Sequence, residues 1–468
     1  MVSDQRPLLA LCTASILLGA VLRFALLNTN GFWLDEMMQM QVVSHPTFAE
    51  MLRAVPPDKL FLDYILLRLW GKESSPEWYL RLPSLFFSLA TIGCLWWAGR
   101  PWKPLWLGAA VFALNPLSIH LAQELLPYSS ATFFLCFSFV SLGLFAKSQY
   151  WRWAVATCGG ALLLSLTNFL ASTALPTLVI AAAMLAFRNR SKGHAVVAAV
   201  LAGVFCFCIG MLWVRMAGVL SSPVPWPFPG PFHLTVHLAE ALAFKVPGPL
   251  AWASIAVFIV LAFGIARVWN DDQELAIILF CWLFVGLALR LLALALTNHW
   301  LARRYLLDFT VPASILIGYG LAPLAGKPWR LGAALVALAA LGVPGLLMLK
   351  GERASYREGI LSVPATARSV LVDSGETAYC YNFYRWVHFP HSPPAFVYER
   401  SSAETARALF ELQPILLFPV VSSGYAPPPD FARLLSENPE PVSWDVIAPA
   451  FDHSAEVSNA EDPVAESE

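Results

Sequence analysis

Long apolar segments separated by short polar connections run through the first three quarters of the chain. The first segment, Leu8 to Leu27, has one charged residue, Arg23, and is long enough to cross a bilayer core of about 30 Å. This pattern predicts a polytopic α-helical membrane protein with about eleven spans. The predicted spans cover residues 8–27, 80–98, 104–120, 129–147, 153–168, 170–187, 195–215, 250–268, 275–296, 304–322 and 329–349. Around Asn168 the apolar residues fit either two short spans or one span with a re-entrant piece.

Basic residues are concentrated in alternate loops. The loops near Glu124, Asn168 and Asn298 are nearly free of lysine. By the positive-inside rule the basic loops are cytoplasmic. They contain Arg6, Arg100, Lys103, Lys147, Arg152, Arg188, Arg190, Lys192, Arg267, Lys327 and Arg330. We therefore expect a multi-pass plasma (inner) membrane protein whose C-terminal segment is extracytoplasmic.

The composition agrees with this class. Hydrophobic residues make up 58% of the chain, charged residues 13%, and the mean hydropathy is +0.61. The formal net charge of −1 gives no basis for nucleic-acid binding. Of the eight cysteines, only Cys380 lies outside the apolar spans, so no disulfide framework is predicted. The first span lacks a small-residue cleavage site, and we expect it to remain as an uncleaved helix.

Residues 28–79 form a long external loop that we expect to hold the catalytic residues. Within it, Leu60 to Trp70 has helical length and a strongly apolar face, which predicts a helix lying along the membrane interface. A second external loop, from Ala217 to Pro249, is rich in proline and cannot be helix or central strand throughout. It fits either a rigid apolar lid or an interfacial connector.

After Lys350 the sequence alternates between short strand and helix patterns. Predicted strands cover residues 369–373, 394–398, 414–420 and 442–447, and predicted helices cover 402–412 and 430–437. We therefore predict a transmembrane module over residues 1–349, a small soluble α/β domain over 350–451 and a disordered acidic tail over 452–468.

The order of several short motifs resembles that of the GT-C superfamily of membrane glycosyltransferases. Trp33-Leu34-Asp35-Glu36 resembles the acidic motif after the first span in the branch of protein O-mannosyltransferases and aminoarabinose transferases. The segment from Asp58 to Trp70 resembles the element that follows, which often reads Asp-His-Pro-Pro-Leu-Tyr-Tyr. Here Asp58-Lys59-Leu60-Phe61-Leu62-Asp63-Tyr64 stands in its place, so the His-Pro-Pro is missing.

Later motifs continue the same order. Arg81-Leu82-Pro83-Ser84 resembles the entry to the second span of the family. Glu124-Leu125-Leu126-Pro127-Tyr128 is similar to a Glu-x-Arg-Pro-Tyr element, with Leu126 in place of the arginine. Thr167-Asn168-Phe169 stands where many members have Thr-His-Tyr, and Arg304-Tyr305 matches a late Arg-Tyr pair. The resemblance implies a GT-C-like fold and a glycosyltransferase, and leaves the sugar and the acceptor open.

Membrane sidedness leads to the same substrate class. Nucleotide sugars are made in the cytoplasm, so an external site needs a donor that crosses with the membrane, such as a polyprenyl-phosphate sugar. Its leaving group is already a stable anion, so the reaction needs a base for the acceptor hydroxyl and cations for the phosphate. We expect Asp35 to be the base, acting with inversion of the anomeric centre, with Glu36 adjusting its ionisation. The alternative is that both residues are solvated loop carboxylates without a catalytic role.

Cations and polar groups at the external ends are the candidates for substrate binding. Arg290 and Arg304 are candidates for the phosphate, with Arg81 and Lys59 also within reach of a headgroup; the alternative for Arg290 is snorkelling. Asp58 and Asp63 are candidates for acceptor hydroxyls or a cation, with a surface role as the alternative. Glu124 and Tyr128 are candidates for the sugar, with capping or interface anchoring as the alternative, and Tyr305 is a further candidate for substrate binding. We expect the acceptor to be a lipid, a glycan or a protein.

No motif requires a cofactor. His233 and His237 share a helical face with Glu240 one turn later, a spacing that fits a divalent metal but also arises by chance. A different class of function also stays open, namely a non-catalytic flippase or transporter of lipid-linked sugars. Symmetric halves with broken spans would favour transport. The sequence shows no such internal symmetry.

Overall fold

The structure is a computed structural model that describes residues 6–27, 31–57, 59–72, 74–168, 171–216, 238–239, 242, 252–297, 303–351, 369–372, 375–387, 395–397 and 415–418. The chain divides into two compact units. The first comprises Met1–Asn28 and Gln39–Lys350, and the second comprises Thr29–Met38 and Gly351–Glu468.

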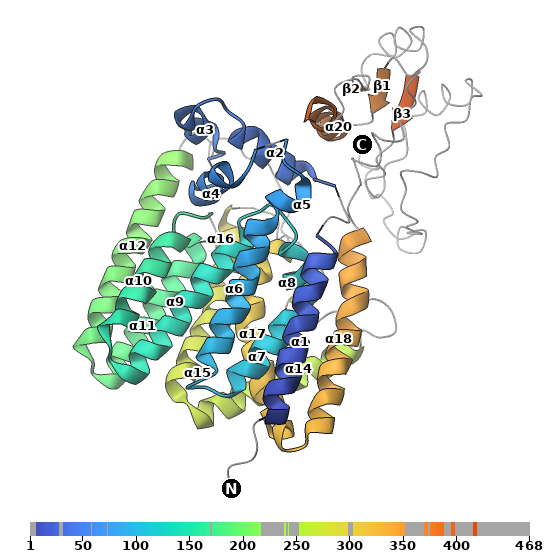
Figure 1. The fold of residues 1–468 in the computed structure, drawn as a ribbon. Helices are drawn as coiled ribbons and strands as arrows, with labels where there is room; N and C mark the ends of the chain where they lie inside the picture. Colours follow the sequence, from blue (N-terminus) through green and yellow to red (C-terminus); the bar gives the residue numbers. More distant parts are fainter. Residues whose placement is uncertain are drawn as a thin grey trace, which may run out of the picture. The chain divides into compact units, whose positions relative to one another are not determined.

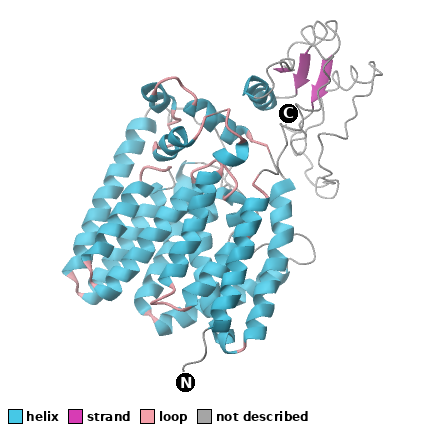
Figure 2. Cartoon of the chain, in the orientation of Figure 1, coloured by secondary structure: helices cyan, strands magenta, loops and turns pink. Residues whose placement is uncertain are grey.

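The first unit is a bundle of long helices with short helices at one end (Figures 1 and 2). The short helices of the predicted external loop are α3 (Phe48–Ala54), α4 (Leu62–Trp70) and α5 (Glu77–Leu80), and α2 (Leu34–Val43) crosses the division between the units. The helices of the bundle are α1 (Arg6–Ala25), α6 (Leu82–Ala98), α7 (Pro104–Leu114), α8 (Pro116–Leu121), α9 (Tyr128–Ser148), α10 (Trp151–Leu164), α11 (Ala171–Asn189), α12 (Lys192–Met216), α14 (Trp252–Asp271), α15 (Gln273–Phe280), the π turn η2 (Cys281–Val285), α16 (Gly286–Thr297), the 3-10 turn η3 (Arg303–Leu306), α17 (Leu307–Leu321), the 3-10 turn η4 (Ala322–Gly326) and α18 (Pro328–Gly351).

The predicted spans correspond to these helices within a few residues. Among the described residues, eight helical segments are long and apolar enough to cross a membrane, and α6 and α7 are shorter apolar helices. The chain is therefore a multi-pass membrane protein. The stretch around Asn168 contains two helices, the 14-residue α10 and the 19-residue α11. The total of about eleven spans stays a prediction.

Helix α9 lies at the centre of the bundle. In a stretch of α9 long enough to cross a membrane, 89% of the residues are buried, against 22% in α1 and in α12. The outer faces of α1 and α12 carry exposed apolar side chains such as Val21 and Val214. Glycines allow two of the closest helix contacts. A Cβ on Gly264 of α14 would overlap the backbone oxygen of Leu316 of α17, and a Cβ on Gly320 would overlap that of Val260.

The predicted span 104–120 is broken into α7 and α8. The Asn115 carboxamide oxygen accepts a hydrogen bond from the Ser118 N–H (3.0 Å), and Pro116 occupies the first turn of α8. Arg23, fully buried in α1, donates to the carbonyl oxygens of Phe112 (3.4 Å) and Ala113 (2.7 Å). The break therefore leaves carbonyl groups that a guanidinium of the first span satisfies.

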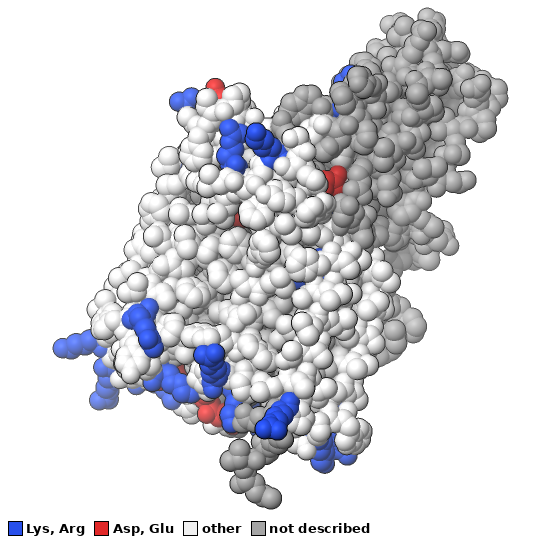
Figure 3. Space-filling view, viewed as in Figure 1, with Lys and Arg blue, Asp and Glu red and all other residues white. Residues whose placement is uncertain are grey.

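Exposed basic side chains gather at one end of the bundle. On the face drawn in Figure 3, lysines and arginines cluster where α6, α9, α11 and α17 end and their successors begin, and the band above is almost free of charge. The exposed members of this cluster are Arg100, Lys103, Lys147, Arg152, Arg188, Arg190, Lys192, Lys327 and Arg330. The loops grouped from the sequence as one set thus lie at the same end of the bundle.

The second unit contains a three-stranded parallel sheet of order β2-β1-β3. Strands β1 (Ser369–Val372), β2 (Ala395–Val397) and β3 (Ile415–Phe418) confirm three of the predicted strands. The helix α20 (Gly375–Val387) lies in the connection between β1 and β2 and was not predicted. The fourth predicted strand, both predicted helices and the acidic tail lie outside the described residues.

Candidate functional site

A small pocket lies at the end of the bundle opposite the basic loops. Four helix ends meet there: the start of α9, the end of α10, the start of α11, and the turn into α17. The polar residues that line it are Tyr128, Thr132, Arg290, Arg304 and Asp308, and Ala131, Leu135, Leu164, Ala174 and Leu307 complete the wall. Two of the late arginines and one tyrosine predicted from the sequence are thus brought together.

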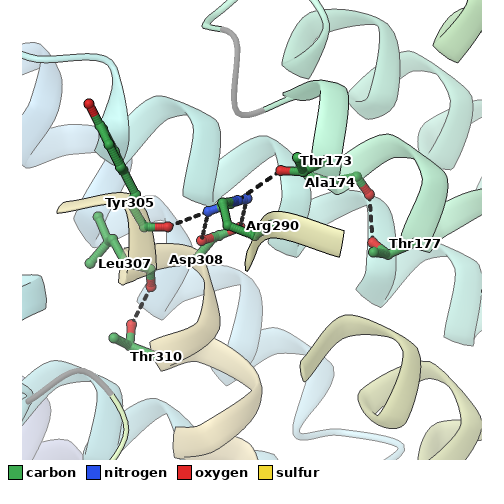
Figure 4. Close-up of polar contacts among 8 residues, drawn as sticks. All are labelled: Thr173, Ala174, Thr177, Arg290, Tyr305, Leu307, Asp308 and Thr310. Atoms are coloured by element: carbon green, nitrogen blue, oxygen red, sulfur yellow. Dashed lines mark hydrogen bonds and ion pairs between the residues drawn. The ribbon is translucent and has the colours of Figure 1, made fainter. Parts of the chain in front are cut away.

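Arg290 is held by a bidentate ion pair with Asp308 (Figure 4). Its two Nη atoms donate to the Asp308 carboxylate at 3.0 and 2.8 Å, and its Nε donates to Thr173 Oγ1 at 2.8 Å. A further Nη1 hydrogen bond goes to the backbone oxygen of Tyr305. Arg290 is 1% exposed and its guanidinium lies 4.9 Å from the centre of the Phe309 ring. All but one of its N–H donors are therefore used within the protein.

The π turn η2 determines which way Arg290 faces. It holds one residue more than an α-helical turn, so everything after it is rotated by about 100° relative to an uninterrupted helix. Trp282 within this turn is buried and stacks on Phe139 of α9 at 4.5 Å between ring centroids. The sequence alone gave no sign of the π turn.

Arg304 lies among aromatic rings at the mouth of α17. Its guanidinium is 6.0 Å from the Tyr128 ring and 5.7 Å from the Tyr305 ring, and the two rings are 6.2 Å apart. Arg304 and Tyr305 are half-buried, whereas Tyr128 is buried. A half-buried cation beside two tyrosine rings is suited to an anionic group that also offers hydroxyl contacts.

The segment after α3 is fixed from two sides. Lys59 forms an antiparallel bridge with Asn168, and the Leu62 N–H donates to the carbonyl of Leu166 at 2.9 Å. Arg215, in the last turn of α12, donates to the carbonyls of Val55 (2.8 Å) and Pro56 (3.0 Å). The segment that contains Lys59 and the segment that contains Asn168 are therefore in direct contact.

Asp63 of α4 contacts the start of α9. Ser130 Oγ donates to Asp63 Oδ1 at 2.6 Å, while Oδ2 is buried without a hydrogen-bond partner. Burial raises the pKa of Asp63 to about 7, and the Ser130 hydrogen bond acts in the opposite direction. A carboxyl group with such a pKa exchanges a proton near neutral pH.

Glu124 pairs with a histidine that the sequence analysis did not select. Its Oε1 lies 3.1 Å from His120 Nε2, and both side chains are buried. Glu124 lies in the turn between α8 and α9. Pro127 has no N–H to continue a helix backward, and α9 begins at Tyr128.

Asp35 and Glu36 occupy the first turn of α2, in the part that belongs to the second unit. Glu36 is fully buried, and its Oε2 accepts a hydrogen bond from the Trp33 N–H at 3.3 Å. The Phe32 N–H donates to the hydroxyl of Tyr384 of α20, which ties this segment to the C-terminal part of its unit. Carboxylates in a first turn are favoured by the helix dipole.

The remaining predicted site residues divide into two groups. Arg81 is 1% exposed and donates to the carbonyl of Leu27 at 3.1 Å, so it fixes the end of the first span. Asp58, His233 and His237 lie outside the described residues, and within those residues no group of three potential metal ligands occurs.

Asp308 is the functional candidate that sequence reasoning missed. It is an acidic residue inside the predicted tenth span, and an intramembrane carboxylate is itself a sign of a partner or a site. It also stands four residues after Arg304, in the first turn of α17. Thr173 carried no comparable signal.

Comparison with known proteins gives structures only. No family model and no curated protein matches the chain. The solved structure of ArnT from Cupriavidus metallidurans bound to undecaprenyl phosphate is 13% identical, with a TM-score of 0.50 over 87% of this chain and 89% of that one. The same protein in the apo state gives 14% identity and a TM-score of 0.48 over 86% and 88%. This chain has an ArnT-like fold.

The ArnT-like fold confirms the predicted resemblance in its architecture. The match extends over most of both chains. At this level of identity it establishes the fold and says nothing of individual side chains.

Proposed function

We propose that this protein transfers a sugar from a polyprenyl-phosphate donor to an acceptor hydroxyl at the external face of the membrane, with inversion. The observation that carries the proposal is the pocket at the end of the bundle opposite the basic loops, where Arg304 lies beside Tyr128 and Tyr305. Basic loops are cytoplasmic by the positive-inside rule, so this pocket faces outward.

The fold and the sidedness together support the proposed donor class. The ArnT structure with a TM-score of 0.50 holds undecaprenyl phosphate. Arg304 and Lys59 are the cations that we assign to the departing phosphate, because an external transferase needs positive charge where the leaving group develops. Glu124 and the two tyrosines supply hydrogen-bonding groups for the sugar, and Asp58 and Asp63 are further candidates for substrate hydroxyls.

Asp35 is the base in this proposal. Its carboxylate removes the proton from the acceptor hydroxyl as that oxygen attacks the anomeric carbon. The bond from this carbon to the phosphate oxygen breaks, and polyprenyl phosphate departs with the electron pair. Attack from the face opposite the phosphate inverts the anomeric centre. Burial of Glu36 beside the Trp33 N–H supports a role in fixing the first turn of α2, which carries Asp35.

The test is to incubate the purified full-length protein with a panel of polyprenyl-phosphate sugars and to measure released polyprenyl phosphate. Release above a no-protein control, dependent on an acceptor, supports the transferase. A flippase would instead move the intact lipid between the leaflets of vesicles without breaking the sugar–phosphate bond. That second result would replace the proposal.

A further inference from the structure

We infer, on the basis of the function proposed above, that Arg290 and Asp308 are a positioning pair for Arg304 and not a second phosphate-binding group. Arg290 lines the same pocket as Arg304, and a cation there was expected to contact the donor phosphate directly. Its contacts assign it a different role.

Four of the five N–H donors of the Arg290 guanidinium are already used within the protein. It binds both oxygens of Asp308, the hydroxyl of Thr173 and the carbonyl of Tyr305. A bidentate fork between arginine and carboxylate is among the strongest charge-assisted contacts in proteins. To offer a phosphate more than its one remaining N–H, Arg290 would have to leave a buried carboxylate without its partner, which is strongly unfavourable.

The charges of the pair cancel. Asp308 is 8% exposed and Arg290 1%, so both lie largely out of water in a part of the bundle that faces apolar neighbours. A paired guanidinium and carboxylate add little net field to the pocket. The pair therefore contributes little to the attraction for an anion, and Arg304, which lines the same wall, is the cation that the proposed function assigns to the phosphate.

The contacts of Arg290 and Asp308 stabilise the turn η3 that carries Arg304 and Tyr305. Arg290 donates to the carbonyl of Tyr305, the residue directly after Arg304 in the 3-10 turn η3, while Asp308 follows in the first turn of α17. Thr173 ties the same guanidinium to α11. Three helices thus fix the backbone that carries Arg304 and Tyr305 (Figure 4). Fixing a group in its binding geometry is worth affinity because less order is lost on binding.

The sign of one substitution separates positioning from simple electrostatics. Asp308→Asn removes a negative charge beside the pocket. If Asp308 acted only through its charge, an anionic lipid would bind more tightly to the variant. If the pair positions Arg304, the same substitution weakens binding, because the amide cannot hold both arms of the Arg290 fork.

The experiment uses the full-length protein in detergent and two probes, undecaprenyl phosphate and undecaprenol, with affinity measured by titration. The variants are Asp308→Asn and Arg290→Lys, each alone and combined with Arg304→Ala. Arg267→Gln is the control, since Arg267 forms an exposed pair with Asp271 (3.3 Å) at the opposite end of the bundle. A neutral double variant, Arg290→Met with Asp308→Leu, leaves no unpaired buried charge and carries the test if a single variant does not fold.

We expect each variant of the pair to weaken binding of undecaprenyl phosphate by about tenfold, the scale of one lost charged contact. Undecaprenol binding and the control should not change, and Arg304→Ala should add little to the pair variants because the pair acts through Arg304. The inference is overturned by tighter binding in Asp308→Asn, by wild-type affinity in Arg290→Lys, or by effects of the pair variants that add fully to that of Arg304→Ala. A wild-type protein that does not prefer the phosphate over the alcohol overturns the proposed donor, and the positioning role with it.

Discussion

Arginines buried in the helical bundle bind oxygen atoms of the chain itself. Arg23 donates to four different residues besides its own helix, among them Ser88 and Ser118, and Arg215 donates to the end of α3 and the loop that follows it. In an apolar environment a carbonyl or guanidinium without a hydrogen bond costs free energy, so these groups bind to one another. A buried arginine in this protein is therefore first a support for a break or turn in the backbone.

Asp35 is the residue on which the proposed chemistry depends. Asp35→Asn keeps the shape of the side chain and removes the base, so turnover should fall by a factor of order 10² or more while folding is preserved. Released polyprenyl phosphate measures turnover, and thermal unfolding in detergent measures the fold. Equal turnover in wild type and variant would transfer the base to Asp58 or Asp63, or end the transferase proposal.

The buried carboxyl of Asp63 should make stability depend on pH. Its folded-state pKa of about 7 is above that of an unfolded aspartate, about 4. Between these values the unfolded chain releases the proton and the folded one keeps it, so stability declines as pH rises toward 7. Compared with wild type, Asp63→Asn should gain in melting temperature from pH 4 to 7 and then remain level. A constant difference across this window would show that the carboxyl is ionised in the folded state.

Helices were more predictable than their interruptions. The spans appear as apolar runs because lipid demands them, and the strands near Ser369, Ala395 and Ile415 appear through their β-branched and apolar residues. The break at Asn115 and the π turn at Cys281 do not interrupt the hydropathy, so the sequence showed one span in each place. Such features arise from contacts with other helices, which a linear pattern does not contain.

Close contact between α14 and α17 should depend on Gly264. Gly264→Ala would force a methyl group into the backbone of Leu316 and should cost about 1–3 kcal/mol, as other overpacked sites do. Gly203→Ala on α12 is the matched control, because a Cβ there meets nothing within 4 Å. Thermal unfolding of both variants in detergent tests this contact. Equal melting temperatures would mean that α14 shifts away at little cost.

At the scale of the whole molecule, the end of the bundle that bears the basic loops should face the cytoplasm. A cysteine at the exposed Lys192 should resist a membrane-impermeant reagent in intact cells, whereas one at the exposed Ser74, between α4 and α5, should react. A cysteine at Ser402 tests the predicted external side of the C-terminal domain. Labelling at Lys192 and protection at Ser74 would place the pocket on the nucleotide-sugar side and rule out the lipid donor.

The candidate site was predictable in its parts and not in its assembly. The motifs that contain Lys59, Tyr128 and Arg304 follow the order of a known family, and the structure places all of them at the end of the bundle opposite the basic loops. The neutralisation of Arg290 by Asp308 could not be predicted. An ion pair between two helices leaves no periodic pattern in the sequence.

The π turn in the ninth span has a consequence for evolution. Structurally, η2 is a single-residue insertion that a helix has absorbed without breaking. If a homologous sequence that lacks the π turn is aligned with this chain without a gap, the residue aligned with Arg290 lies one position away from the structurally equivalent one. That residue points about 100° around the helix, toward a different neighbour. Relatives that keep both the arginine and the aspartate but lack the π turn should have one residue fewer between positions 274 and 290. In relatives that retain the π turn, the length of this short stretch, more than its composition, is therefore the quantity that we expect natural selection to hold constant.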